Sequence, residues 1–166
     1  PLFLRAAKGA EATVQDADGN LQQASTPLKN NLKTWLNSVR MVTDTVDIFD
    51  AKIINLGLEI DIVVDQRTNL STVLADVREK LFEELTLTKP EIGQSFSVGE
   101  VEKILSKIPY VVRFNSVKVV LKSGTGYSET RFDIVSNVSP DGGLIYIPEN
   151  CIWELKNSSD ITGKIQ

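Results

Sequence analysis

One strand-like segment constrains the fold of this chain more than any other feature. From Lys52 to Asp65 the apolar residues recur at every second position, a period that places them on one face of a β-strand. That face contains Ile54, Leu56, Leu58, Ile60, Ile62 and Val64. The other face contains Asn55, Gly57, Glu59, Asp61 and Asp65, with Ile53 and Val63 as apolar exceptions to the alternation. The segment therefore predicts a long strand with one buried face and one largely solvent-exposed face.

Three other segments have the period of an amphipathic helix. The first begins at Thr26 and Pro27, which favour a helix start. Its apolar stripe contains Leu28, Leu32, Trp35, Leu36, Val39 and Val42. The second follows a predicted cap at Asn69, with apolar positions Leu70, Val73, Leu74, Val77, Leu81, Phe82 and Leu85. In the third, Ser97 and Glu100 form a capping-box pattern, and we expect the helix to end at Pro109.

Two β-rich segments, 110–114 and 117–121, follow the third helix. The alternation of apolar residues breaks at Asn115 and Ser116, between the two segments. This break predicts a bulge or bend in an otherwise continuous strand.

The last part of the chain is also strand-like. Residues 131–138 and 144–147 flank the turn sequence PDGG at 140–143 and predict a hairpin. Residues 151–155 and 161–166 are further candidate strands. The order of these elements predicts the α+β class. We expect an N-terminal helix, a long amphipathic strand, two helices and a strand-rich C-terminal part that forms a mixed or antiparallel sheet.

We expect three regions along the chain. Residues 1–26 predict an extended arm or hairpin, 27–50 a helix and linker, and 51–166 an α+β domain. The first residue is Pro1, and no charged-then-apolar leader follows it. We therefore expect the chain to be a fragment or a processed product of a longer protein.

The composition excludes much catalytic chemistry. The chain has no histidine, which removes Ser-His-Asp and Cys-His nucleophiles and nearly every zinc site. Its only cysteine, Cys151, has apolar neighbours, so we expect a buried and inert thiol. No apolar run is long enough to span a membrane. We expect no enzymatic activity, no cofactor, no metal and no small-molecule substrate.

A nucleic-acid partner is also not expected. The 18 basic and 22 acidic residues give a net charge of −4, the opposite of the balance that phosphate binding favours. Arg113, Lys118 and Lys122 could contact a phosphate backbone, but acidic residues are interleaved with them and no aromatic stacking pair accompanies them.

One pair of carboxylates has a spacing that occurs in glycosidases. Glu59 and Asp61 lie two residues apart on one strand face, roughly 6.5 Å along the chain. If the strand at 117–121 is an antiparallel neighbour, Lys118 and Lys122 would pair with them. We therefore expect a solvated strand face rather than a hydrolase site.

Two loops partly resemble ligand-binding motifs. Asp16, Asp18 and Asn20 resemble the start of a calcium loop, but the glycine falls at position four and position twelve is not glutamate. Residues 124–127 lack the third glycine and the following helix of a phosphate-binding loop. We expect a turn at the first and a flexible connection between strands at the second.

One stretch resembles a known family. Residues 35–44 read WLNSVRMVTD, and residues 46–57 read VDIFDAKIINLG. This pair of phrases resembles the C-terminal region of the baseplate wedge protein of T4-like contractile-tailed phages, relatives of the baseplate J-like family. In that family a helix ending in a similar phrase leads into a long strand, and a helix, a second helix and more strands follow. The resemblance covers roughly residues 28–125.

The resemblance implies a structural protein of the virion. Such wedge subunits lie in the tail baseplate, self-associate as dimers and contact a second wedge protein, and repeated wedges form a ring. The family has no catalytic residues to carry over. A dimer needs exposed apolar surface, and the candidate interface residues are Trp35, Met41, Tyr146 and Trp153, because aromatic and methionine side chains are favoured interface anchors.

Three other functions compete with this one. The first is a ligand- or nucleic-acid-binding α+β module, since such folds are widely reused. The second is a hydrolase that uses Glu59 and Asp61. The third is the equivalent subunit of a contractile secretion machine, which the sequence hardly separates from a phage protein.

Overall fold

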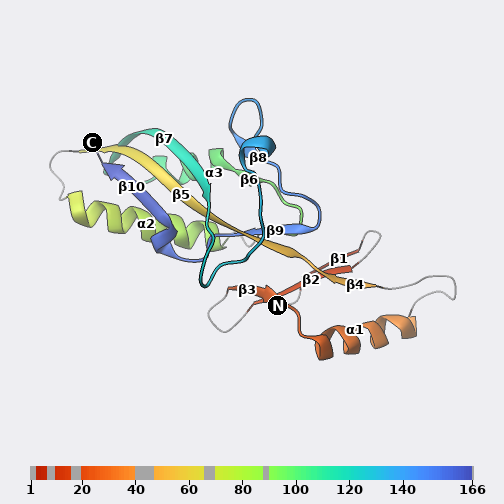
Figure 1. Cartoon of the computed structure of the whole chain (residues 1–166). Helices are drawn as coiled ribbons and strands as arrows, with labels where there is room; N and C mark the ends of the chain where they lie inside the picture. Colours follow the sequence, from red (N-terminus) through yellow and green to blue (C-terminus); the bar gives the residue numbers. More distant parts are fainter. Residues whose placement is uncertain are drawn as a thin grey trace.

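The computed structural model describes residues 3–6, 10–15, 20–39, 47–65, 70–87 and 90–165 (Figure 1). The fold is α+β, as the sequence predicts. The helices are α1 (Thr26–Val39), α2 (Leu70–Leu87) and α3 (Val98–Ser106), and the 3-10 turns are η1 (Val135–Asn137) and η2 (Ser158–Asp160). The strands are β1 (Phe3–Ala6), β2 (Ala10–Gln15), β3 (Leu21–Gln23), β4 (Ile48–Asp50), β5 (Lys52–Val64), β6 (Phe96–Ser97), β7 (Val111–Leu121), β8 (Leu144–Ile145), β9 (Cys151–Glu154) and β10 (Ile161–Ile165).

The predicted long strand is confirmed as β5, the centre of the main sheet. Its alternate side chains from Ile54 to Val64 are buried, and none of them is more than 4% exposed. β7 runs antiparallel to residues 56–64, β10 pairs in parallel with residues 58–62, and β9 pairs in parallel with residues 52–55. The main sheet is therefore mixed.

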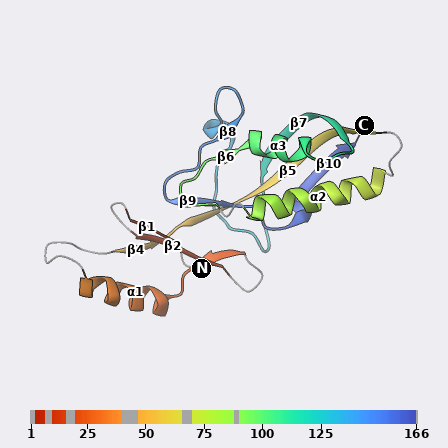
Figure 2. The same cartoon turned by 180° about the vertical axis from the view of Figure 1, so that it is seen from behind.

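Two helices cover the apolar face of this sheet (Figures 1 and 2). The buried side chains of α2 are Val73, Val77, Leu81 and Leu85, and those of α3 are Val98, Val101 and Leu105. The predicted cap of α3 is confirmed, because the Ser97 hydroxyl accepts a hydrogen bond from the Glu100 backbone N–H at 3.3 Å. The helix ends at Ser106, three residues before the predicted terminator Pro109.

The predicted bulge is confirmed within β7. Asp61 lies opposite Ser116, and the next residue of β5, Ile62, lies opposite Phe114. Asn115 is therefore the extra residue on the bulged strand. β7 continues on both sides of it as one strand.

The prediction of a strand over 131–138 is wrong. This segment contains η1, and only Val138 forms a bridge, with Ile145. The Asp133 carboxylate accepts hydrogen bonds from the Ser136 hydroxyl at 2.5 Å and the Val135 N–H at 3.1 Å. These local bonds compete with strand pairing and favour a turn.

The chain reverses direction at residues 140–143, as predicted, although the paired part of the hairpin is short. The backbone N–H of Gly142 donates to the Ser139 carbonyl at 2.8 Å, and the Ser139 N–H donates to the Leu144 carbonyl at 2.8 Å. Gly142 has a φ of 74°, which favours glycine. β8 then pairs antiparallel with β6.

The second face of β5 is less exposed than the sequence predicts. Asn55 is 3% exposed and Gly57 is buried, whereas Glu59 is exposed. An added Cβ at Gly57 would lie 3.0 Å from the Asp160 carbonyl and closer still to Lys122. The segments that precede β10 and follow β7 therefore cover the first half of this face.

The N-terminal part forms a second sheet. β2 pairs antiparallel with β1 and β3, so the predicted hairpin arm is confirmed. β4, which falls in the predicted linker, pairs in parallel with β2 and leads directly into β5. α1 begins at Thr26 as predicted. The predicted cap at Asn69 and the part of the first helix beyond Val39 lie outside the described residues.

Candidate interaction surfaces

The first candidate surface is the outer side of α1. None of the residues of this helix is buried, and Leu28, Trp35 and Val39 are 37%, 62% and 64% exposed. They are separated by seven and by four residues, which places them along one side of the helix. We call these three residues the α1 surface. It is a row of apolar side chains that the described part of the chain leaves uncovered.

Ion pairs connect α1 to the adjoining strand. The Lys29 ammonium lies 2.6 Å from the Asp50 carboxylate, and the Lys33 ammonium lies 3.0 Å from the Asp47 carboxylate. Lys29 and Lys33 are the only charged residues between Thr26 and Val39. With both lysines paired to aspartates, the outer side of α1 carries no uncompensated charge.

The second candidate surface lies on the hairpin that contains β8. We call residues 133–147 the hairpin lobe. Its exposed apolar side chains are Val135, Val138, Leu144 and Tyr146. Leu144 and Tyr146 alternate with the buried Ile145 and therefore share one face. In both views α1 lies at one end of the molecule, whereas the hairpin lobe lies near the middle of its upper side, so the two are well separated (Figures 1 and 2).

Two aspartates shape the hairpin lobe. The hydrogen bond from the Ser136 hydroxyl is the main cause that lowers the pKa of Asp133. For Asp141, the bond from the Ser139 hydroxyl at 2.5 Å is the main cause that lowers the pKa, with a further bond from the Gly143 N–H. Both carboxylates are therefore ionised at neutral pH, and both are exposed.

The predicted interface residues differ in their exposure in the fold. Trp35 and Tyr146 are exposed on the two surfaces described above. The prediction that Trp153 is an interface residue is wrong, because Trp153 is only 3% exposed and its ring packs edge-on against Phe96 with centroids 5.0 Å apart. It contributes to the core and offers no surface to a partner. Met41 lies outside the described residues.

The carboxylate pair lies on the exposed face of the main sheet. Glu59 is directly opposite Lys118, as predicted, and Asp61 is directly opposite Lys164 on β10. Lys122 pairs instead with Asp160, at 3.9 Å. The shallow depression over this face has a volume of about 410 Å³ and is lined by both acids and both opposing lysines. Alternating charges of this kind are typical of a solvated sheet face.

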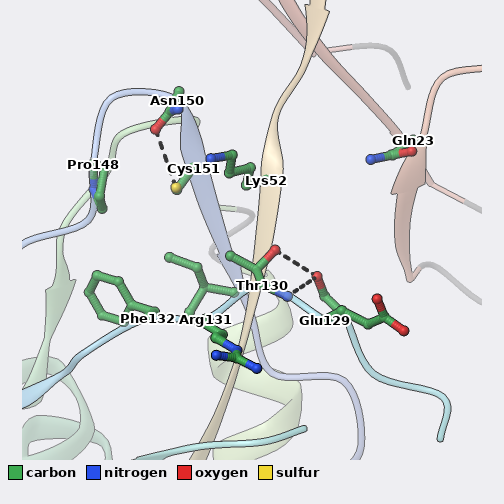
Figure 3. A pocket seen from close by; sticks show the side chains of 11 residues that line it. Gln23, Lys52, Glu129, Thr130, Arg131, Phe132, Pro148, Asn150 and Cys151 are labelled. Atoms are coloured by element: carbon green, nitrogen blue, oxygen red, sulfur yellow. Dashed lines mark hydrogen bonds between the residues drawn. The ribbon is translucent and has the colours of Figure 1, made fainter. Parts of the chain in front are cut away.

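A cleft lies between β3, the start of β5 and the segment that follows β7 (Figure 3). It has a volume of about 520 Å³. Cys151 lines it but is only 5% exposed, and its thiol lies 3.4 Å from the Asn150 side-chain oxygen. In Figure 3 Lys52, Glu129 and Arg131 point in different directions. Recognition of one ligand would require charged groups that converge on a common point. The charged groups of these three residues do not converge.

A buried polar network fixes the N-terminal sheet to the main sheet beside this cleft. Glu154 is 8% exposed, and its carboxylate accepts hydrogen bonds from the Leu21 N–H at 2.5 Å and the Asn55 amide at 2.7 Å. The Asn55 side-chain oxygen accepts a third bond from the Ser128 N–H at 2.7 Å. These bonds satisfy buried polar groups and so account for the burial of Glu154.

Residues 124–127, the loop that partly resembles a phosphate-binding motif, are held in place by neighbouring side chains. The Tyr127 hydroxyl donates to the Asp160 carboxylate at 2.6 Å, and this bond is the main cause that raises the pKa of Tyr127. The Lys156 ammonium donates to the Gly126 carbonyl at 2.5 Å. These contacts belong to the packing of the loop, and no helix follows to provide an anion site. Of the predicted calcium-like turn, Asp16 and Asp18 lie outside the described residues.

Among the residues that the structure describes, no group of three or more histidine, cysteine, aspartate or glutamate side chains is placed to hold a metal ion. In the same residues, no helix is long and apolar enough to cross a membrane.

Sequence reasoning missed several of the exposed apolar residues. Phe49 is 58% exposed on β4, and Val135 is 82% exposed on η1. The pattern around Val135 favoured a strand, which would have placed it in a sheet. One signal was available for the hairpin lobe, since no lysine or arginine occurs between Arg131 and Lys156.

A scan against protein-family models finds no match to this chain, and a search of the curated proteins finds none either.

Proposed function

We propose that this chain is a structural subunit of a phage tail baseplate wedge. It acts by self-association and by assembly with other wedge proteins into the baseplate ring, so it is part of the virion after assembly in the host cytoplasm. The proposal assigns it no enzymatic activity, cofactor, nucleic acid or membrane.

The observation that carries this proposal is the presence of two separate apolar surfaces on the described structure. A subunit of a ring needs at least two contacts, one on each side. The α1 surface and the hairpin lobe together hold most of the exposed large apolar side chains of the described residues. Exposed apolar patches of this kind are typical of protein–protein contacts.

We assign self-association to the α1 surface. A contact between two identical faces brings each charge close to its own copy, so a neutral face is compatible with pairing. The α1 surface meets this condition because Lys29 and Lys33 are both paired with aspartates. Trp35 is the residue on this surface with the largest side chain, and tryptophan is a favoured anchor at interfaces.

The alternatives have less support. A hydrolase would need its two carboxylates in an enclosed site, but Glu59 is exposed and directly opposite Lys118. A ligand-binding module would use the cleft beside β5, where the charged groups point apart (Figure 3). The equivalent subunit of a contractile secretion machine would use the same two surfaces, and it is the second candidate.

The experiment that tests self-association is light scattering after size exclusion, over a wide range of concentration. We expect the native chain to form a dimer. The substitution Trp35→Ser should raise the dissociation constant at least tenfold, because loss of a buried aromatic anchor costs about 2 kcal/mol or more.

Val112→Ser is the matched control, since Val112 is 67% exposed on β7 and lies outside both surfaces. It should leave the dimer unchanged. A native chain that stays monomeric at every concentration would refute self-association. A dimer that Trp35→Ser leaves intact would refute the role of the α1 surface.

A further inference from the structure

The hairpin lobe differs from the α1 surface in its charge. Between Arg131 and Lys156 every charged residue is acidic, and the acids are Asp133, Asp141, Glu149 and Glu154. Glu154 is buried in the network described above, whereas Asp133, Asp141 and Glu149 are exposed. Within residues 132–155, the exposed apolar side chains of the hairpin lobe are therefore accompanied by negative charge alone.

This charge pattern selects among possible partners. A second copy of the same hairpin lobe would bring its acids close to like charges, which disfavours pairing. Nucleic acids and anionic membranes are disfavoured for the same reason. A protein surface with an apolar centre and lysine or arginine at its border is complementary to the hairpin lobe in both respects.

The strand edges also restrict how a partner can bind. β8 pairs with β6 along one edge, and Ile145 bridges Val138 on the other. The backbone of β8 therefore has no free edge for an added strand, and recognition must use side chains. Leu144 and Tyr146 share one exposed face and can pack against the apolar stripe of a helix.

We propose that the hairpin lobe docks an amphipathic helix of a partner protein, with an apolar stripe bordered by lysine and arginine. This inference rests on the proposed assembly function and names the chemistry of the second contact. Leu144 and Tyr146 provide the apolar contact, and Asp133, Asp141 and Glu149 attract the basic border.

The test uses two synthetic helical peptides with the same leucine stripe, one bordered by lysine and the other by glutamate. Each carries a fluorophore, and its binding to the full chain is followed by anisotropy at 50 mM and 150 mM salt. The lysine peptide should bind, more weakly at the higher salt because screening shortens the range of the attraction. The glutamate peptide should show no measurable binding.

Variants locate the contact. The double substitution Leu144→Ser and Tyr146→Ser should weaken binding of the lysine peptide at least tenfold. Glu149→Lys should weaken it about threefold or more without removing an apolar contact. Val112→Ser is again the control and should bind like the native chain. The double substitution changes no charge, so the loss of binding that it causes distinguishes docking at the hairpin lobe from general attraction to an acidic protein.

Several outcomes would overturn the inference. These are equal binding of both peptides, binding of neither, or binding that the double substitution leaves unchanged. A loss of self-association in the double variant would also overturn it, since a second copy would then occupy the hairpin lobe. A native chain that is monomeric but binds the lysine peptide would instead refute self-association alone.

Discussion

At the scale of single residues, Asn55 shows how one side chain connects three segments. Its amide donates to Glu154 on β9, and its oxygen accepts from the backbone of Ser128 after β7. The Glu154 carboxylate in turn accepts a hydrogen bond from the N–H of Leu21 on β3. Asn55 is only 3% exposed, so water cannot replace these bonds if the side chain is removed.

We therefore expect Asn55→Ala to lower the free energy of unfolding by about 2–4 kcal/mol, because a buried carboxylate and a backbone N–H each lose a partner. Denaturant titration followed by circular dichroism measures the change. Asn31→Ala is the matched control, since Asn31 is exposed on α1, and it should change stability by less than about 0.5 kcal/mol. Equal effects of the two substitutions would contradict the role assigned to the network.

At the scale of elements, β10 approaches α2 closely because Gly163 has no side chain. Gly163 lies opposite Ile60 on the core face of the main sheet. A Cβ at this position would lie 2.6 Å from a methyl group of Leu74 and 3.0 Å from Ile60. A residue with a Cβ at this position would therefore require the side chains of Leu74 and Ile60 to shift.

Gly163→Ala should lower the free energy of unfolding by about 1–3 kcal/mol, since an added methyl group overpacks this contact. Thermal or denaturant unfolding measures the loss. Lys164→Ala, on the exposed face of the same strand, is the control and should have little effect. If Gly163→Ala is neutral or stabilising, the helix and the strand are not packed at their limiting distance.

Elements whose structure depends on local patterns were predictable from the sequence. The strand β5 was predicted from its period of two. The bulge at Asn115 was predicted from a break in the alternation of β7, and the cap of α3 from Ser97 and Glu100. The segment 131–138 was predicted wrongly because its apolar content favours a strand, whereas the side chain of Asp133 stabilises a turn.

The candidate surfaces were predictable only in part, since exposure depends on tertiary packing. Trp35 and Trp153 are the same residue type, and the sequence predicts both as interface residues. Trp35 is exposed because nothing described covers the outer side of α1, and Trp153 is buried because β9 runs beside β5 against Phe96. The burial of Asn55 was missed for the same reason, because its partners come from distant parts of the chain.

At the scale of the whole molecule, the main hydrophobic core is contributed by one region. All of its buried members lie between Ile54 and Ile161. The N-terminal sheet is attached to it by the bond from Leu21 to Glu154 and by packing of Leu21 and Ile53 around a small second cluster. The boundary that the sequence predicts at residue 51 stays a prediction.

We predict that residues 51–166 fold on their own and unfold cooperatively. Loss of the hydrogen bond to a buried carboxylate costs about 1.5–3 kcal/mol, which should lower the melting temperature by roughly 5–12 °C relative to the full chain. Circular dichroism and amide NMR spectra measure the transition and the dispersion of signals. A fragment without a cooperative transition would show that the N-terminal sheet is needed for folding.

The direct continuation of β4 into β5 has a mechanical consequence. A pull on the N-terminal sheet is transmitted through the backbone to the start of β5, along the strand axis. β5 is held by β7 over residues 56–64 and by β10 over residues 58–62. Such a pull loads these hydrogen bonds together, in shear, rather than breaking them one after another. The main sheet is thus arranged to resist tension along the axis of β5.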